Sequence, residues 1–206
     1  TEEWPAPTDL HQLSVTVPGL RPGGLAAGIG DILLNYRYQA VGVGGTGWLA
    51  MAPRLSLAFP SGDYKKGMGR GNPGLQFNLP VSMELGDQLV THLNAGTTYT
   101  PRAKSPGGRV EAVMDGNAGL ALVWLPLSWL NPLVEVAFLS TEEVRDNGSG
   151  GRSSQVTVNP GVRAAFNFKS GLQVVPGVSV PIQFAEHNTE YSAFFYLSFE
   201  HPAWDQ

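Results

Sequence analysis

Residues 75–85 read LQFNLPVSMEL, and every second position in this stretch is apolar. Successive side chains of a β-strand point to opposite faces of a sheet, so this spacing predicts a strand with one apolar and one polar face. The same alternation recurs in residues 31–40, 155–168 and 172–184. The sequence therefore predicts an all-β protein whose strands have two faces of different polarity.

We predict ten strands, each bounded by residues that are typical of turns. Their expected ranges are 9–17, 30–41, 47–59, 73–85, 88–101, 115–125, 132–143, 154–168, 172–184 and 191–200. Several of these ranges are longer than the roughly five or six residues of a strand in a soluble sheet. They match the roughly 9–11 residues with which a tilted strand crosses a bilayer.

The expected connections alternate in length along the chain. The short ones are residues 86–87, 128–131 and 169–171, and the long, polar, glycine-rich ones are residues 60–72, 102–114 and 144–153. Outer-membrane barrels have short periplasmic turns and long extracellular loops. The pattern therefore predicts one domain over residues 1–206, an antiparallel up-and-down transmembrane β-barrel with about 10 strands. Its apolar side chains would face lipid and its polar side chains the lumen.

A soluble β-sandwich or lipocalin-like barrel shows the same alternation, with the apolar face turned inward. Strand length, alternating connections and the low charge of the apolar faces favour the membrane barrel. Prolines inside the predicted strands remove ladder donors, so we expect bulges or distortions there, and paired bulges at 160–161 and 176–177. These prolines are Pro53, Pro80, Pro160, Pro176 and Pro181.

Composition excludes several classes of protein. The 206 residues carry a net charge of -4 without a basic stripe, so no nucleic-acid partner is expected. Mean hydropathy is -0.06, and no apolar run approaches the roughly 18 residues of a membrane helix. Cysteine is absent, which excludes disulfides and Cys-based zinc sites. Residues 1–4 have no signal-peptide character, so the signal of an exported protein would have been removed, or the sequence begins inside the mature chain.

Nothing in the sequence indicates catalysis, so we expect no enzyme, no cofactor and no metal. A Gly-x-Ser-x-Gly nucleophile elbow is not present. The histidines lie too far apart for close metal-ligand spacing. They are His11, His92, His187 and His201.

Charged residues on the predicted polar faces are the candidate functional groups. They either line an aqueous path or fill and brace a narrow interior. The lumen candidates are Arg37, Arg54, Glu84, His92, Glu135, Arg163 and Glu200. Pairing around a symmetric loop centred near residue 149 predicts that Glu135 lies opposite Arg163.

Aromatic residues are candidates for the interfacial girdles of a membrane barrel. The alternative is that some of them pack within turns. The girdle candidates are Tyr36, Tyr38, Trp48, Tyr99, Trp124 and Trp129.

Short motifs follow one another almost from end to end of the chain. They are Glu3-Trp4-Pro5, His11-Gln12-Leu13-Ser14, Gly28-Ile29-Gly30-Asp31, Leu34-Asn35-Tyr36-Arg37-Tyr38-Gln39, Pro60-Ser61-Gly62-Asp63, Val175-Pro176-Gly177 and Tyr196-Leu197-Ser198-Phe199-Glu200-His201-Pro202. In order and spacing the chain resembles the outer-membrane transporter family of the MetA pathway of phenol degradation. The resemblance implies an outer-membrane barrel of about twelve strands, with one or two of them before Thr1. The final residues, Ala203-Trp204-Asp205-Gln206, depart from the aromatic last residue of many such barrels.

We therefore expect a channel or transporter for small, hydrophobic or aromatic compounds in the outer membrane of a Gram-negative bacterium. The alternative is a non-conducting structural barrel that anchors a larger outer-membrane assembly, with a protein partner or further copies of the chain. Outer-membrane lipid is the expected partner in both cases.

Overall fold

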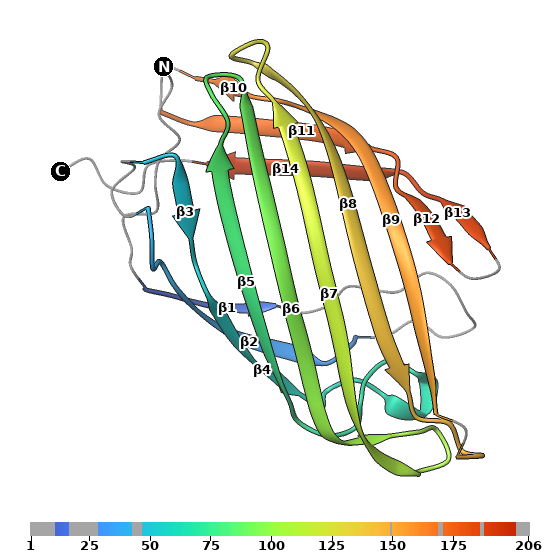
Figure 1. Cartoon of the computed structure of the whole chain (residues 1–206). Helices are drawn as coiled ribbons and strands as arrows, with labels where there is room; N and C mark the ends of the chain where they lie inside the picture. Colours follow the sequence, from blue (N-terminus) through green and yellow to red (C-terminus); the bar gives the residue numbers. More distant parts are fainter. Residues whose placement is uncertain are drawn as a thin grey trace.

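The computed structural model describes residues 11–16, 29–42, 47–148, 150–168, 171–185 and 188–200. Over these residues the chain forms one 14-stranded antiparallel β-sheet and a short 3-10 helix, η2 (Tyr64–Lys66) (Figure 1). The strands are β1 (His11–Thr16), β2 (Ile32–Tyr38), β3 (Leu49–Met51), β4 (Arg54–Phe59), β5 (Gly74–Glu84), β6 (Leu89–Lys104), β7 (Val110–Trp124), β8 (Leu130–Glu143), β9 (Gly151–Ala164), β10 (Phe166–Asn167), β11 (Gln173–Ser179), β12 (Ile182–Ala185), β13 (Thr189–Tyr191) and β14 (Phe194–Glu200). No helix in this part of the chain is long and apolar enough to cross a membrane.

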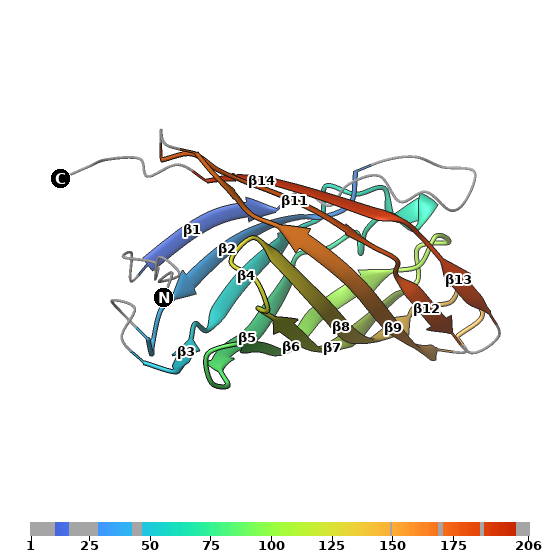
Figure 2. The same cartoon turned by 90° about the horizontal axis from the view of Figure 1, so that it is seen from above.

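Strands that follow one another in the chain also lie next to one another in the sheet. The order runs β1-β2-β4-β5-β6-β7-β8-β9-β11, and β14 pairs with the far side of β11. Figure 2 shows that the sheet curls, so that it has a concave and a convex face. The strands β1 and β14 are the two ends of this path, and no backbone pairing joins them within the described residues.

Each of the ten predicted ranges overlaps one strand or two consecutive pieces of a strand. Two of the interruptions coincide with prolines: Pro53 lies between β3 and β4, and Pro181 lies between β11 and β12. Proline has no N–H with which to complete the ladder. The register is the same on both sides of each interruption, so each pair of pieces is one strand that lacks a donor.

The predicted bulges at the two Pro-Gly pairs are wrong. Pro160 and Pro176 both pair with their neighbours in ladders without a shift of register. A Cβ atom added at Gly161 would lie 2.7 Å from the Cβ atom of Ser179, so glycine permits the close approach of β11 here. The shift of register lies between residues 100 and 103 of β6 instead.

The predicted long loop at residues 102–114 is also wrong. Strand β6 continues to Lys104 and β7 begins at Val110, so only residues 105–109 connect them. The bulge in β6 changes the phase of the alternation, which hides the end of the strand from a two-residue pattern. Side chains near this hairpin form a small buried apolar cluster of Ala103, Val113 and Val144.

The two faces of the sheet differ in polarity. Phe77 on the convex face is 45% exposed, whereas the next residue, Asn78 on the concave face, is 2% exposed. Of the other apolar residues at alternate positions in 75–85 and 155–168, Leu75, Val156 and Phe166 are exposed, and Leu79, Val81, Val158 and Val162 are partly exposed. Gln76, Asn159 and Arg163, at the positions between them, are partly buried.

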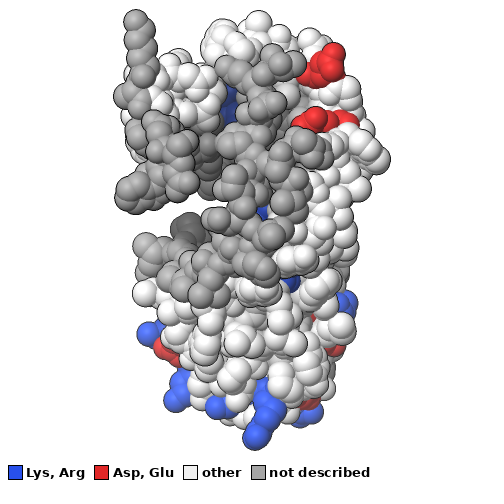
Figure 3. Space-filling view, turned by 90° about the vertical axis from the view of Figure 1, so that its left-hand side faces the viewer, with Lys and Arg blue, Asp and Glu red and all other residues white. Residues whose placement is uncertain are grey.

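The buried side chains confirm this contrast. The largest fully buried ones in the described part of the chain are all polar: Asn35, Ser56, Thr100 and Ser105. On the face drawn in Figure 3, basic side chains gather at one end of the molecule, and a broad surface with few charges lies beyond them. Soluble proteins bury apolar side chains instead, so this distribution is reversed.

Candidate functional site

Polar side chains form a row across the concave face, from β5 to β9. In the backbone register Ser82 lies beside His92, and Glu135 lies beside Asn159. Ala121 of β7 joins the two pairs, because it pairs with both His92 and Glu135. The Ser82 hydroxyl is 2.8 Å from His92 Nδ1, and Asn159 Nδ2 donates to Glu135 Oε2 over 2.7 Å. The Ser82–His92 pair and the Glu135–Asn159 pair therefore lie in one line that crosses the strands of the sheet.

The prediction that Glu135 lies opposite Arg163 is wrong. The ladder between β8 and β9 is centred on residue 147, midway between the paired residues 142 and 152. Strand β9 begins at residue 151 rather than 154, so the loop is not symmetric about residue 149. Arg163 consequently pairs with Asn131, four positions from Glu135.

Arg37 and Arg54 form a second group on the concave face, where β2 pairs with β4. Arg37 Nη2 donates to Gln39 Oε1 over 2.7 Å, and Gln39 Nε2 donates to the carbonyl of Val41 over 2.6 Å. The Nε atom of Arg54 is buried and has no hydrogen-bond partner within the described residues. This group braces the wall of the sheet away from the row.

The two remaining candidates lie at strand ends. Glu84 is exposed at the end of β5, and Glu200 ends β14, where its side chain is outside the described part. The seven candidates therefore do not form one cluster: His92 and Glu135 belong to the polar row, Arg163 pairs with Asn131 four positions from it, and the arginines of β2 and β4 form another group.

A cluster of amides, which sequence reasoning missed, fills part of the concave face. Asn78 Oδ1 accepts hydrogen bonds from Asn94 Nδ2 (3.2 Å) and Asn117 Nδ2 (3.0 Å), on the two following strands. Gly96 leaves the space for this arrangement, because a Cβ atom there would overlap the Asn78 side chain.

A cavity of about 260 Å³ opens on the concave face beside the polar row. A second cavity of about 320 Å³ is lined mainly by β8 and β9 nearer to the connection between them. The first is lined by Glu135, Ala137, Thr157, Asn159, Pro181 and Phe194. Apolar walls with a few polar groups are typical of small-molecule sites.

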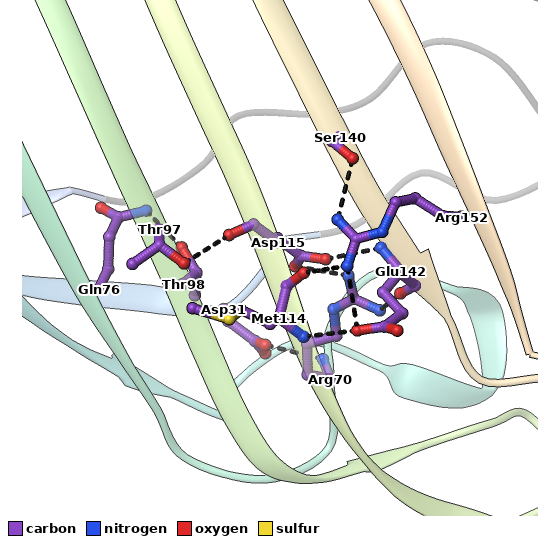
Figure 4. A network of polar contacts seen from close by, with 10 residues as sticks. All are labelled: Asp31, Arg70, Gln76, Thr97, Thr98, Met114, Asp115, Ser140, Glu142 and Arg152. Carbon is purple, nitrogen blue, oxygen red and sulfur yellow. Dashed lines mark hydrogen bonds and ion pairs between the residues drawn. The ribbon is translucent and has the colours of Figure 1, made fainter.

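The connection between β4 and β5 reaches across to β7 and β8 through Arg70 (Figure 4). Arg70 Nη2 lies 2.6 Å from Asp115 Oδ2, and its Nη1 donates to the carbonyl of Glu142 over 2.8 Å. The pairing of β7 with β8 ends at Gly116 and Ser140. Beyond that point the N–H of Glu142 donates to Asp115 Oδ1. Arg70 therefore occupies the place where the two strands separate.

Asp31 holds the same connection at the β2 side of the sheet. Its carboxylate accepts hydrogen bonds from the N–H groups of Gly62 (3.0 Å) and Arg70 (2.8 Å). Sequence reasoning missed this network, because Arg70 is 39 positions from Asp31 and 45 positions from Asp115. The available signal was that Asp31 and residues 60–63 both belong to the short motifs described above.

The six aromatic candidates are all exposed. Trp48, Trp124 and Trp129 lie at the end with the short turns, whereas Tyr99 lies toward the other end and Tyr36 lies within β2. Their exposed fractions run from 42% (Tyr38) to 64% (Trp48). Their role as membrane girdles stays a prediction.

Neither the protein-family models nor the curated proteins that were compared with the sequence match this chain. Within the described ranges, no group of three or more His, Asp or Glu side chains could hold a metal ion. The fold and the site define an all-β protein whose single large antiparallel sheet has a polar concave face with a small cavity.

Proposed function

We propose that the chain is a transmembrane β-barrel of a Gram-negative outer membrane, and that small solutes, hydrophobic or aromatic ones among them, pass through its interior. The reversed polarity of the two faces carries the proposal: Phe77 is exposed while Asn35, Ser56 and Asn78 are buried. In water an apolar face of this extent would need a cover. In a bilayer the lipid chains cover it, and the polar face lines the interior. The resemblance to a family of outer-membrane transporters supports the same function.

The proposal places a requirement on the two ends of the sheet. In lipid, every backbone N–H and C=O group needs a hydrogen-bond partner within the protein. Strands β1 and β14 would therefore pair with each other or with another strand in the membrane. Within the described residues the ladders from β2 to β11 keep a constant register apart from one bulge in β6, which supports a sheet that can close in this way.

A non-conducting barrel that anchors a larger assembly is the second candidate. The feature that favours it is the connection held by Arg70 and Asp31, which reaches across one end of the interior. The amide cluster around Asn78 narrows the interior further. A barrel of about eight to ten strands is filled mostly by its own side chains.

Single-channel recording in a planar bilayer tests the proposed function. The chain is refolded into lipid vesicles, its insertion is checked by protease protection, and the wild type is compared with Arg70→Ala and with the control Lys65→Ala. Discrete conductance steps for the wild type, larger for Arg70→Ala and unchanged for Lys65→Ala, support a channel. Insertion without conductance in any of the three favours the anchor. A chain that stays monomeric in buffer and does not enter vesicles contradicts the membrane barrel.

A further inference from the structure

The cavity beside Glu135 offers many hydrogen-bond acceptors and few donors. Asn159 Nδ2 already donates to Glu135, and Asn159 Oδ1 is buried without a hydrogen-bond partner within the described residues. The hydroxyl of Thr157 can donate or accept, and the side chains of Ala137 and Pro181 can do neither. A ligand of this cavity must therefore supply the donors.

The carboxylate of Glu135 gives the cavity a negative charge. Glu135 is exposed, and its hydrogen-bond partner, Asn159, is neutral. None of the ion pairs found in the described residues includes Glu135. A cationic ligand would thus meet a carboxylate that forms no ion pair with an arginine or lysine of the described part of the chain.

The opposite side of the cavity is apolar. Phe194 of β14 is 55% exposed and lines the cavity together with Pro181, which precedes β12. The face of an aromatic ring attracts a cation, and its edges and the proline ring pack against a carbon skeleton. A bare metal ion or an ammonium ion would leave this apolar side unused.

We propose that this cavity binds a small organic cation: a primary ammonium group on an aromatic or branched apolar skeleton. The ammonium group donates to the Glu135 carboxylate and to the hydroxyl of Thr157, and the apolar part lies against Phe194 and Pro181. The inference names a class of solute for the proposed channel. It rests on the proposed function because the channel would bring the solute to the cavity, whereas binding itself needs only the cavity. The cavity volume of about 260 Å³ limits the ligand to a small molecule.

Calorimetric titration of the detergent-folded chain tests the inference without a membrane. Three probes share one skeleton and differ in charge: 2-phenylethylammonium, 2-phenylethanol and 3-phenylpropanoate. The variant is Glu135→Gln, which keeps the shape of the side chain and an acceptor for Asn159. The matched control is Glu84→Gln, the same change on the same face but outside the cavity. Circular dichroism confirms that all variants keep the wild-type β-sheet.

We expect the ammonium probe to bind at least about tenfold more tightly than the alcohol, and the carboxylate probe to bind most weakly. Glu135→Gln abolishes the preference for the ammonium probe, and Glu84→Gln keeps it. Equal affinities for the three probes, a preference for the carboxylate, no binding at all, or a preference that survives in Glu135→Gln would each overturn the inference. A chain that conducts without this preference retains the proposed function. A chain that has the preference but does not conduct loses only the proposed function.

Discussion

At the scale of single residues, Arg70 joins the connection between β4 and β5 to strands β7 and β8. Its guanidinium joins a carboxylate and a backbone carbonyl, and the Arg70–Asp115 pair is only 26% and 18% exposed. Arg70→Ala leaves Asp115 without its cation in a partly buried position. We expect the free energy of unfolding to fall by roughly 2 kcal/mol, since hydrogen bonds to charged groups contribute about 1.5–3 kcal/mol. Urea titration in vesicles measures it, and Lys65→Ala, at an exposed position in η2, should change it by less than about 0.5 kcal/mol.

Val158 and Asn159 are adjacent residues on opposite faces of β9. Under the proposed function Val158 faces lipid, so Val158→Arg should cost roughly 2–4 kcal/mol near the middle of the bilayer. Asn159→Arg places the same group on the concave face beside Glu135, where its charge is compensated. Its cost should be clearly smaller in the same refolding experiment. Equal costs for the two variants would contradict the assignment of the faces.

Alternation alone was sufficient to predict individual faces but not individual contacts. The pattern places Glu135 on the polar face, and in the structure it lies beside Asn159 rather than beside Arg163. Its partner could not be predicted, because that depends on where β9 begins and a change of a few residues in the loop moves every pair. Asp31 and Arg70 could not be paired either, since a contact between distant loop residues leaves no periodic signal.

At the scale of elements, the prolines show which features of the strands the sequence predicts and which it does not. Pro53 interrupts β3 and β4, yet the register continues across it. Strand β6 shows the opposite case: Pro101 lies inside it without interrupting it, but the register shifts between residues 100 and 103. A proline in the sequence shows where a donor is missing, but not whether the register continues or shifts there. A bulge depends on how two strands fit each other, so neither strand shows it alone.

Pro53→Ala should join β3 and β4 into one strand. The carbonyl of Pro53 accepts from the N–H of Tyr38, 3.0 Å away. In an antiparallel ladder the N–H and C=O of one residue point to the same neighbour, so the new N–H faces the Tyr38 carbonyl. We expect slow hydrogen exchange at residue 53 and a gain of about 1 kcal/mol in stability. Pro106→Ala in the exposed turn is the control, and its amide should exchange fast. Fast exchange at residue 53 would show that β3 and β4 stay separate.

At the scale of the whole molecule, the position of the tryptophans tests how the sheet sits in a bilayer. Trp48, Trp124 and Trp129 are exposed at the end with the short turns. Tryptophan at a membrane interface lies at the level of the lipid headgroups. With Trp4 and Trp204 replaced by phenylalanine, lipids brominated near the headgroup should quench the fluorescence more than lipids brominated at the chain end. Stronger quenching from the chain end would rule out an interfacial girdle here.

The length of β6 has a consequence for the outer surface of the cell. Its 16 residues extend over about 53 Å, which is about 40 Å along the membrane normal at the usual tilt, against an apolar band of about 25 Å. Under the proposed function the tryptophans mark one edge of the apolar band, so the part of β6 that is longer than the band lies at the other end, beyond the bulge. Under the proposed function, the hairpin of β6 and β7 projects from the bilayer as a stiff stalk. Residues 105–109 at its tip would then be an epitope that an antibody reaches on intact cells.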